Sequence, residues 1–306
     1  MNEPLVSVVI PSYNRAHCIA DAIRSALVQD WPNLELIIAD DGSSDDTEGA
    51  VRALNEPRVR YVRKVNGGCS SARNFGAAHA RGKYVAYLDS DDTWEKTWLR
   101  DAVAIMEKDP GVGAVYSSLE HIDKDGKPVG VMDLTLGGRY AEASVPYVLT
   151  RCMGMLGSNI IARPEIVKSI GGWDEGFPTS GDLDFGLRLA TATRVALVAT
   201  PYVKLVETAG SLSKKVNSGN RLRVLAKFEA THPDKAREYA NILRASRARI
   251  YVTYAEDLLW FGRIREAEEQ LRNSLRTEFS VRACWLLLKA QMMRLLGTRR
   301  GSSATP

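Results

Sequence analysis

Three aspartates, Asp89, Asp91 and Asp92, stand within four residues directly after the apolar stretch at residues 85–88. Such a stretch is typical of a buried strand, and like charges at its end repel one another and are costly to desolvate. A solvated turn explains the cluster if the side chains bond to their own backbone, with Asp92 capping a helix that begins near Trp94. A divalent cation also explains it, since Mg²⁺ and Mn²⁺ prefer oxygen ligands. The local pattern leaves both explanations open.

Strand and helix patterns alternate in the N-terminal part of the chain. Short apolar runs, several of them β-branched, occupy residues 5–11, 34–41, 58–65, 83–89 and 112–119, and a helix-like segment follows each of the first four. This alternation predicts an α/β fold with a mainly parallel sheet covered by helices on both faces. Sheets of this kind bind ligands at the carboxyl ends of their strands.

Polar loops follow the first four predicted strands. Their sequences are PSYN, DDGSSDD, NGGCSSARN and DSDD. If the strands are parallel, these loops share one edge of the sheet and their carboxylates converge in one cleft. The carboxylates concerned are Asp40, Asp41, Asp89, Asp91 and Asp92. Convergence favours a binding site over a set of unrelated solvated turns.

The composition is that of an ordinary globular protein. The chain has 306 residues, 45% of them hydrophobic and 25% charged, and the net charge of +4 gives no indication of nucleic-acid binding. The four cysteines show no paired spacing, which predicts reduced thiols and neither disulfides nor a zinc site. We find no signal sequence and no apolar run long enough to span a membrane, so we expect a cytoplasmic location.

The rest of the chain divides into a mixed region and a helical one. Asp125 and Gly126 are typical of a hairpin turn, and residues 207–220 are polar and rich in Gly, Ser and Lys, as in a mobile lid. Helical patterns then continue almost to the end, with Gly262 at an expected helix–helix turn. We expect a catalytic domain over residues 1–218 and a helical extension over residues 219–306.

Five sequence pieces, in order, resemble the family 2 glycosyltransferases, which are inverting enzymes of the Rossmann-like GT-A fold. They are VSVVIPSYNR, LELIIADDGSSDDT, NGGCSSARNFGAAHARGKYVAYLDSDD, GSNIIARPEIVKSIGGWDEGF and GDLDFGLRLA, and the resemblance covers roughly the first 215 of the 306 residues. One piece alone would be unspecific, but five in order are a strong signal.

The resemblance implies a set of donor contacts. Pro11 and Tyr13 match the strand end that holds the nucleotide base and ribose. Asp41 matches the carboxylate that accepts a hydrogen bond from the base imide, although it is also placed to cap a helix. Arg73 matches a nucleotide contact, with an ordinary helix-surface position as the alternative. Asp40 is assigned no contact.

The resemblance also implies the metal and catalytic residues. Asp89 and Asp91 match the Asp-x-Asp motif that contacts ribose and a divalent metal, Mg²⁺ or Mn²⁺, beneath the pyrophosphate. Asp182 matches the base that deprotonates the acceptor hydroxyl, and Asp184 is its main competitor. Trp173 matches the loop that approaches the donor sugar and the acceptor, but a packing role in the core is equally open.

Two departures from the family pattern bear on these roles. Gly181 stands before Asp182 where the family commonly has Glu, and no His precedes the Ser of the lid. A third protein ligand for the metal is therefore in doubt, and Lys214 or Lys215 would be placed to meet the diphosphate instead.

These features together predict a single-sugar transferase. The donor would be a nucleotide-diphosphate sugar in which the sugar is carried by UDP or dTDP, with a guanine nucleotide as the alternative. The acceptor would be a hydroxyl group of a glycan or of a lipid-linked molecule. Bacterial surface polysaccharide assembly is the expected setting. A non-catalytic sugar-nucleotide binder and a sugar-nucleotide pyrophosphorylase are the rival functions, although the loop after the first strand lacks the glycines of the latter.

The C-terminal segment is basic. Beyond Ser280 it carries Arg282, Lys289, Arg294, Arg299 and Arg300 and no acidic residue. Trp285, Leu288, Met292, Leu295 and Leu296 recur near one face of a predicted helix. Two roles are open: peripheral contact with an anionic membrane, or the last helix of a small bundle whose basic residues are solvated.

Overall fold

The computed structural model describes residues 3–123, 125–138, 140–151, 155–206 and 218–296. The chain divides into two compact units, Met1–Gly210 and Ser211–Pro306. The boundary that the sequence predicted, after residue 218, lies slightly later in the chain than this observed boundary. It falls in the first turn of α8, which begins at Ser218. The polar stretch expected to form a lid lies outside the described residues up to residue 217, as do Lys214 and Lys215.

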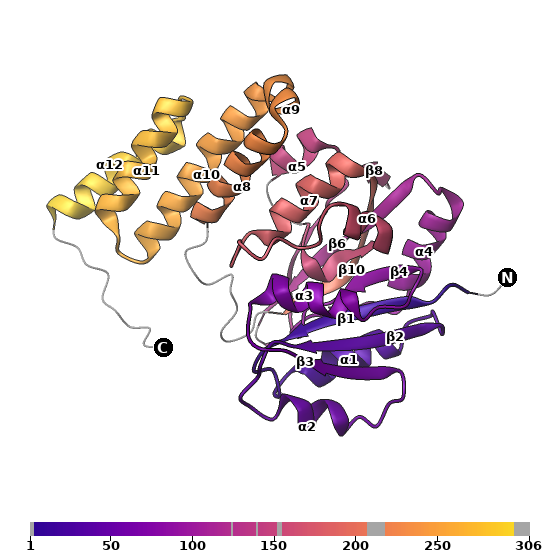
Figure 1. Ribbon diagram of the computed structural model, residues 1–306. Coiled ribbons are helices and arrows are strands. Elements are labelled where there is room, and N and C mark those ends of the chain that lie inside the picture. The colour runs from indigo at the N-terminus through magenta and orange to yellow at the C-terminus, as the bar shows by residue number, and fades with distance from the viewer. Residues whose placement is uncertain (1–2, 124, 139, 152–154, 207–217, 297–306) are drawn as a thin grey trace. The chain divides into compact units, whose positions relative to one another are not determined.

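The first unit is built on one mixed sheet with the strand order β3-β2-β1-β4-β9-β6-β10-β5 (Figure 1). Its strands are β1 Val6–Ser12, β2 Leu34–Asp40, β3 Val59–Arg63, β4 Tyr84–Tyr87, β5 Thr93–Trp94, β6 Val112–Ile122, β7 Pro128–Met132, β8 Tyr140–Glu142, β9 Ile160–Ala162 and β10 Arg194–Val206. The strands β1 to β4, β6 and β10 run in one direction, because β9 pairs antiparallel with both β4 and β6. The expectation of a mainly parallel sheet is confirmed for this set.

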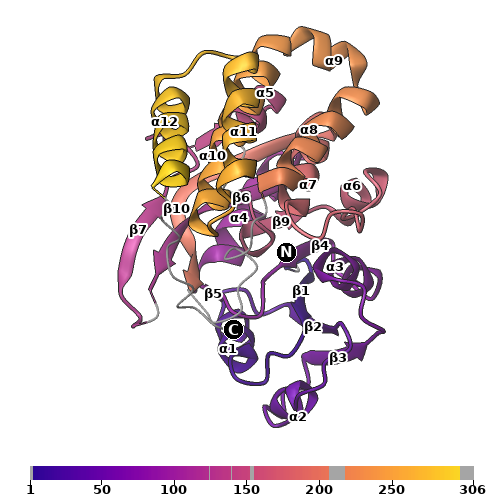
Figure 2. The ribbon, with the colours of Figure 1, turned by 90° about the vertical axis from the view of Figure 1, so that its left-hand side faces the viewer.

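Helices cover both faces of the sheet. They are α1 Ile19–Leu27, α2 Thr47–Arg52, α3 Cys69–Ala78, α4 Trp98–Lys108, α5 Val145–Arg151, α6 Pro164–Ser169 and α7 Gly181–Ala192, with a short 3-10 turn η1 at Gly157–Asn159. Side chains alternate along a strand, so Val6, Val8 and Ile10 of β1 join the core formed with α1 and α4. Val9 faces the other way, toward α3, and Figure 2 shows α1 and α3 on opposite sides of β1 and β2.

The helix expected near Trp94 begins later. Thr93 and Trp94 form the short strand β5, which pairs with Lys204 and Val203 of β10, and α4 starts only at Trp98. The prediction that Asp92 caps this helix is therefore wrong. The expected hairpin is confirmed, since β6 and β7 pair antiparallel and Gly126 has a φ of +79°.

The second unit consists of helices α8 Ser218–Thr231, α9 Pro233–Glu238, α10 Ala240–Trp260, α11 Ile264–Thr277 and α12 Val281–Leu295. Gly262 sits between α10 and α11 with a φ of +72°, as the sequence predicted. Buried residues of α10, α11 and α12, including Ala255, Leu271 and Ala283, form one small core. None of the helices that the structure describes is long and apolar enough to cross a bilayer.

Gly76 lets α3 lie directly on the sheet. A Cβ at this position would come within 2.4 Å of Val9 Cγ1 and 3.1 Å of Ala39 Cβ. Val9 and Ala39 are fully buried in β1 and β2, so neither side chain has room to move aside. The close approach of α3 to the strands therefore depends on the absence of a side chain here.

We expect Gly76→Val to destabilise the first unit, because overpacking a close-packed core costs roughly 1–3 kcal/mol. Gly130→Val is the matched control, since Gly130 lies in the exposed strand β7 with open space around its Cα. Chemical denaturation should give a lower unfolding midpoint for Gly76→Val and an unchanged one for Gly130→Val. Equal midpoints for the two variants would contradict this packing.

Candidate active site

The ends of β1, β2, β3 and β4 lie along one edge of the sheet, as their parallel register requires. Direct contacts join the loops that follow. The backbone N–H of Asn14 donates to Ser43 Oγ at 2.8 Å, and the Asn14 side-chain oxygen accepts from the Ser44 N–H. The prediction that these loops share one rim is confirmed.

Asp41 is held by the glycine-rich loop after β3. Its carboxylate accepts hydrogen bonds from the backbone N–H groups of Gly67 and Gly68, at 2.9 and 2.7 Å, and from Lys64 Nζ at 3.0 Å. A carboxylate has about four acceptor positions, and these donors fill three of them. The predicted contact with a base imide would use the remaining one, so that assignment stays a prediction. Asp40 is structural, because Tyr61 Oη and the Ser43 N–H donate to it.

Arg73 forms the central ion pair of the site. Its Nη2 lies 2.6 Å from Asp89 Oδ1, and its guanidinium carbon lies 4.4 Å from the centroid of the Trp173 ring. Burial lowers the pKa of Arg73, but the charges of Asp89 and Asp182 outweigh this effect and raise it. Asp89 makes the largest of the contributions that raise the pKa, and Asp182 makes a smaller one. Gly157 accommodates Arg73, since a Cβ there would come within 2.3 Å of Nη2.

Asp91 pairs with Arg15 across 3.3 Å, which joins the loop after β4 to the loop after β1. Within the described ranges, His, Cys, Asp and Glu side chains form no group of three that fits a metal ion. Two carboxylates do fit a Mg²⁺- or Mn²⁺-type ion that takes its other ligands from a bound phosphate and water. The described donor set thus fits an ion that arrives with a diphosphate, and the described residues alone do not form a cage around a metal ion.

Asp92 follows Asp91 in the loop after β4 and connects this loop to η1 and to β10. It accepts a hydrogen bond from Ser158 Oγ, in η1, and one from the Val206 N–H at 3.3 Å, at the end of β10. Ser158 Oγ in turn accepts from the Asp89 N–H at 3.1 Å. Burial and the charges of Asp89 and Asp91 raise the pKa of Asp92 well above its usual value. Asp92 therefore anchors the loop of the Asp-x-Asp motif, which replaces the helix-capping role expected from the sequence.

Cys69, the first residue of α3, lies near the carboxylates of the rim. Burial raises the pKa of its thiol to about 11, with Asp89, Asp91 and Asp41 adding to the shift and Arg73 opposing it. One side chain at the start of α3 thus experiences carboxylates from two different loops. Cys18, Cys69 and Cys284 are free thiols, as predicted, and Cys152 lies outside the described residues.

Trp173 packs beneath the site. Its side chain is 1% exposed and stacks on Phe185 at 4.0 Å between ring centroids, with Arg73 on the site side. This is the packing role that the sequence left open beside a direct donor contact. In this structure Trp173 supports Arg73 and presents no open surface to a ligand.

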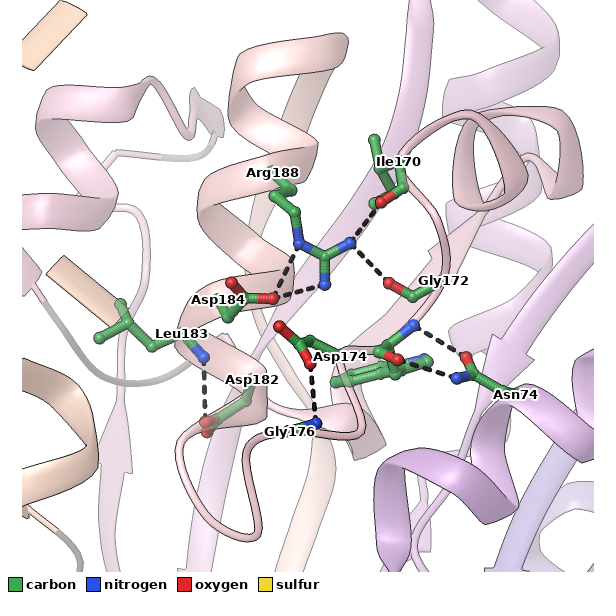
Figure 3. A network of polar contacts seen from close by, with 10 residues as sticks. Asn74, Ile170, Gly172, Asp174, Gly176, Asp182, Leu183, Asp184 and Arg188 are labelled. Carbon is green, nitrogen blue, oxygen red and sulfur yellow. Dashed lines mark hydrogen bonds and ion pairs between the residues drawn. The ribbon is translucent and has the colours of Figure 1, made fainter. Parts of the chain in front are cut away.

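Asn74 holds the backbone around Trp173. Its Oδ1 accepts from the Trp173 N–H, and its Nδ2 donates to the Trp173 carbonyl, both at 2.8 Å (Figure 3). Nδ2 also lies 2.9 Å from Glu175 Oε1. Asn74 follows Arg73 on α3, so one helix fixes both the central cation and the loop that packs under it.

Asp182 and Asp184, both in the first turn of α7, differ in their surroundings. Asp184 is buried and pairs at 2.5 Å with Arg188, which also donates to the carbonyls of Ile170 and Gly172 (Figure 3). Asp182 Oδ1 accepts from the Leu183 N–H at 3.0 Å, and its charge also contributes to a raised pKa of Tyr116, which is due first to burial. Asp184 therefore has a structural partner, and Asp182 is the carboxylate whose charge reaches the cluster around Arg73.

Pro11 and Tyr13 lie at the end of β1. Pro11 is buried and pairs with Ala39 of β2, whereas Tyr13 is 50% exposed. The exposed ring is available to stack on a base, and Pro11 fixes the strand end that presents it.

Sequence reasoning did not assign Arg15, Lys64 or Ser158 to the site. Arg15 and Lys64 each neutralise a carboxylate of the rim, and Ser158 links Asp89 to Asp92. A signal for the first pair was a basic residue at the end of one predicted strand, Lys64, and another in the loop after the first strand, Arg15. Nothing local marks Ser158, because its partners lie more than sixty residues away.

A model described as glycosyl transferase family 2 matches residues 7–168. An uncharacterized glycosyltransferase of Rickettsia felis is 30% identical over 222 residues, which are 71% of this chain and 36% of the relative. Chondroitin synthase of Pasteurella multocida is 40% identical over 125 residues, 40% of this chain and 13% of the relative. The chain thus spans little more than a third of the first of these relatives and much less of the second.

Two solved structures share the fold. S. aureus TarS 1-349 in complex with UDP aligns with a TM-score of 0.66 and 17% identity, covering 98% of this chain and 94% of that chain. The mannosyltransferase PcManGT from Pyrobaculum calidifontis, in complex with GDP-Man and Mn²⁺, aligns with a TM-score of 0.60 and 22% identity, covering 96% of this chain and 81% of that chain. The GT-A fold that the resemblance implied is therefore confirmed.

The two aspartates of α7 should differ in their effect on stability. Removing one partner of a buried ion pair costs about 3–5 kcal/mol, so we expect Asp184→Ala to lower the free energy of unfolding by about 3 kcal/mol. Asp182→Ala, two residues earlier in the same turn and at a less buried position, should cost less than about 1 kcal/mol. Urea denaturation of both variants measures the difference, and equal losses would contradict the structural role given to Asp184.

Proposed function

The chain belongs to glycosyl transferase family 2, and from this premise we propose that it is an inverting, metal-dependent glycosyltransferase. It would transfer a single sugar from a nucleotide-diphosphate sugar to an acceptor hydroxyl. The observation that carries the proposal is the position of Arg73. This one guanidinium is bonded to Asp89 of the Asp-x-Asp motif and lies against Trp173, which stacks on Phe185 of α7, the helix that carries Asp182. The donor-binding and base positions thus belong to one packed cluster.

The donor half of the site would use the rim of the sheet. Tyr13 would stack on the base and Asp41 would accept from its imide, while Asp89 and Asp91 would hold a Mg²⁺ or Mn²⁺ ion against the diphosphate. Such an ion, when bound, neutralises the charge that develops on the leaving diphosphate. Arg15 and Arg73 hold the two carboxylates in place beforehand, so binding requires little reorganisation of the loops.

The acceptor half would use Asp182. A carboxylate at the acceptor oxygen removes its proton as the bond to the sugar carbon forms and the bond to the diphosphate oxygen breaks. The proton goes to Asp182 and the electron pair leaves with the diphosphate. A displacement in one step inverts the configuration at the sugar carbon.

The donor nucleotide is proposed to be UDP or dTDP. An acidic residue suits the imide N–H of uracil or thymine, and the structurally similar TarS binds UDP. Guanine also offers a donor there, and the similar PcManGT binds GDP-Man, so guanine nucleotides belong in any screen.

The acceptor is proposed to be a glycan or a lipid-linked hydroxyl, used on the cytoplasmic side in bacterial surface polysaccharide assembly. The partial likeness to a chondroitin synthase supports a polysaccharide product. The helical second unit would then serve as a docking region for the acceptor, a membrane or a partner.

We expect Asp182→Asn to abolish turnover while nucleotide binding persists, because the amide keeps the size of the side chain and loses the base. General-base catalysis contributes about 10²–10⁴-fold, so release of nucleoside diphosphate from a panel of UDP-, dTDP- and GDP-sugars with Mn²⁺ should fall by at least 100-fold.

Glu165→Gln is the matched control, since it makes the same acid-to-amide change on the exposed surface of α6. Its turnover and its calorimetric affinity for the nucleotide should equal those of the wild type. Full activity in Asp182→Asn would refute the assignment of the base. If the wild type binds the nucleotide but shows no turnover with any divalent metal ion, the proposed enzymatic function is refuted. That result would favour a non-catalytic sugar-nucleotide binder.

A further inference from the structure

The outward side of α12 carries a row of exposed apolar side chains. It consists of Val281, Trp285, Leu288, Met292 and Leu295, which we call the α12 stripe, and each member is between 60% and 81% exposed. The intervals of four, three, four and three residues place all five along one line of the helix. Lone exposed apolar residues are ordinary, but a contiguous row marks an interaction surface.

The opposite side of α12 already has its packing partner. Ala283, Leu286 and Ala290 are buried in the small core formed with α10 and α11, and Figure 2 shows α12 running alongside α11. The helix therefore does not need the stripe in order to hold its place in the second unit. The sequence left two roles open for this segment, a helix of the bundle and a helix that binds a surface. The helix α12 can have both roles, because its buried side packs in the bundle and its exposed side remains available for binding.

The charges that α12 itself contributes are all basic. Lys289 lies 5.2 Å from the centroid of the Trp285 ring. Arg282, next to Val281, is exposed but pairs with Glu256 of α10 at 2.6 Å, and Arg294 pairs with Glu268 of α11 at 3.1 Å. Residues 279–296 contain no acidic side chain, and Arg299 and Arg300 follow in the sequence. An apolar row with a Trp and flanking basic residues matches the chemistry of an anionic bilayer surface, where Lys side chains extend toward the headgroups.

A second copy of the chain fits the stripe less well. Its spacing is that of a coiled-coil seam, but α12 is only 15 residues long, whereas coiled coils need three or more heptads. The positions that flank such a seam are occupied by Arg282 and Lys289, and the helix offers no acidic residue to pair with them across an interface. Self-association at this seam would therefore gain no pairing of opposite charges between the two helices.

We propose that the α12 stripe docks this protein on the surface of anionic lipid bilayers. The stripe enters the interface between headgroups and acyl chains, and Lys289, beside Trp285, contacts lipid phosphates. Attachment is peripheral, in keeping with the lack of a spanning helix among the described residues. The proposal is independent of the proposed chemistry, because nothing in it involves the first unit.

Co-sedimentation of the full chain with lipid vesicles tests this proposal. Vesicles of phosphatidylcholine with one-third phosphatidylserine should bind the protein at least about fivefold more tightly than pure phosphatidylcholine, since a basic residue near the surface adds a factor of about five and Lys289 supplies one. The double variant Trp285→Ser/Leu288→Ser should bind the anionic vesicles at least tenfold more weakly. Lys289→Gln should lose about fivefold on anionic vesicles only.

Val129→Ser/Val131→Ser is the matched control, because it removes two apolar side chains that are 65% and 56% exposed on β7. It should bind as the wild type does. Equal binding of the stripe variant and the wild type, or no binding to either vesicle, would overturn the proposal. A wild-type dimer in sedimentation velocity without lipid, lost in the stripe variant, would overturn it in favour of self-association.

Discussion

The site depends on one buried cation, the guanidinium of Arg73. Three constraints meet on this group: the ion pair with Asp89, the contact with the face of Trp173, and the open space left by Gly157. A buried guanidinium without its carboxylate would be strongly unfavourable, so the loop that carries Asp89 must stay where α3 places its partner. The position of α3 in turn follows from Gly76, which lets the helix lie against Val9 and Ala39.

The rim shows how a fold tolerates clustered carboxylates. Asp41, Asp89 and Asp91 each have a basic partner, respectively Lys64, Arg73 and Arg15. Asp92, which is deeper, instead has hydrogen-bond donors and a raised pKa. In the proposed site, a divalent cation would compete with arginines for the oxygens of Asp89 and Asp91, and a diphosphate that arrives with the cation would compensate those arginines in turn.

Much of this arrangement could be predicted from the sequence, and the limits have physical causes. Apolar periodicity and strict alternation of elements predicted the parallel strands and their common edge, since both depend on local pattern. The role of Asp92 was not predictable, because its partners Ser158 and Val206 come from distant segments. The orientation of Trp173 was not predictable for the same reason. Its motif predicted a loop near the site, but only the stacking on Phe185 and the hydrogen bonds with Asn74 show that its ring faces the core.

Metal-dependent binding of a nucleoside diphosphate tests the central claim most directly. The claim is that the rim forms a donor site in which Asp89 and Asp91 hold a cation against the diphosphate. In calorimetric titrations with UDP, dTDP and GDP, we expect one nucleotide to bind at least tenfold more tightly with Mn²⁺ than with EDTA, and Asp91→Asn to remove that difference. Equal affinity with and without Mn²⁺, or no binding of any of the three, would contradict the account.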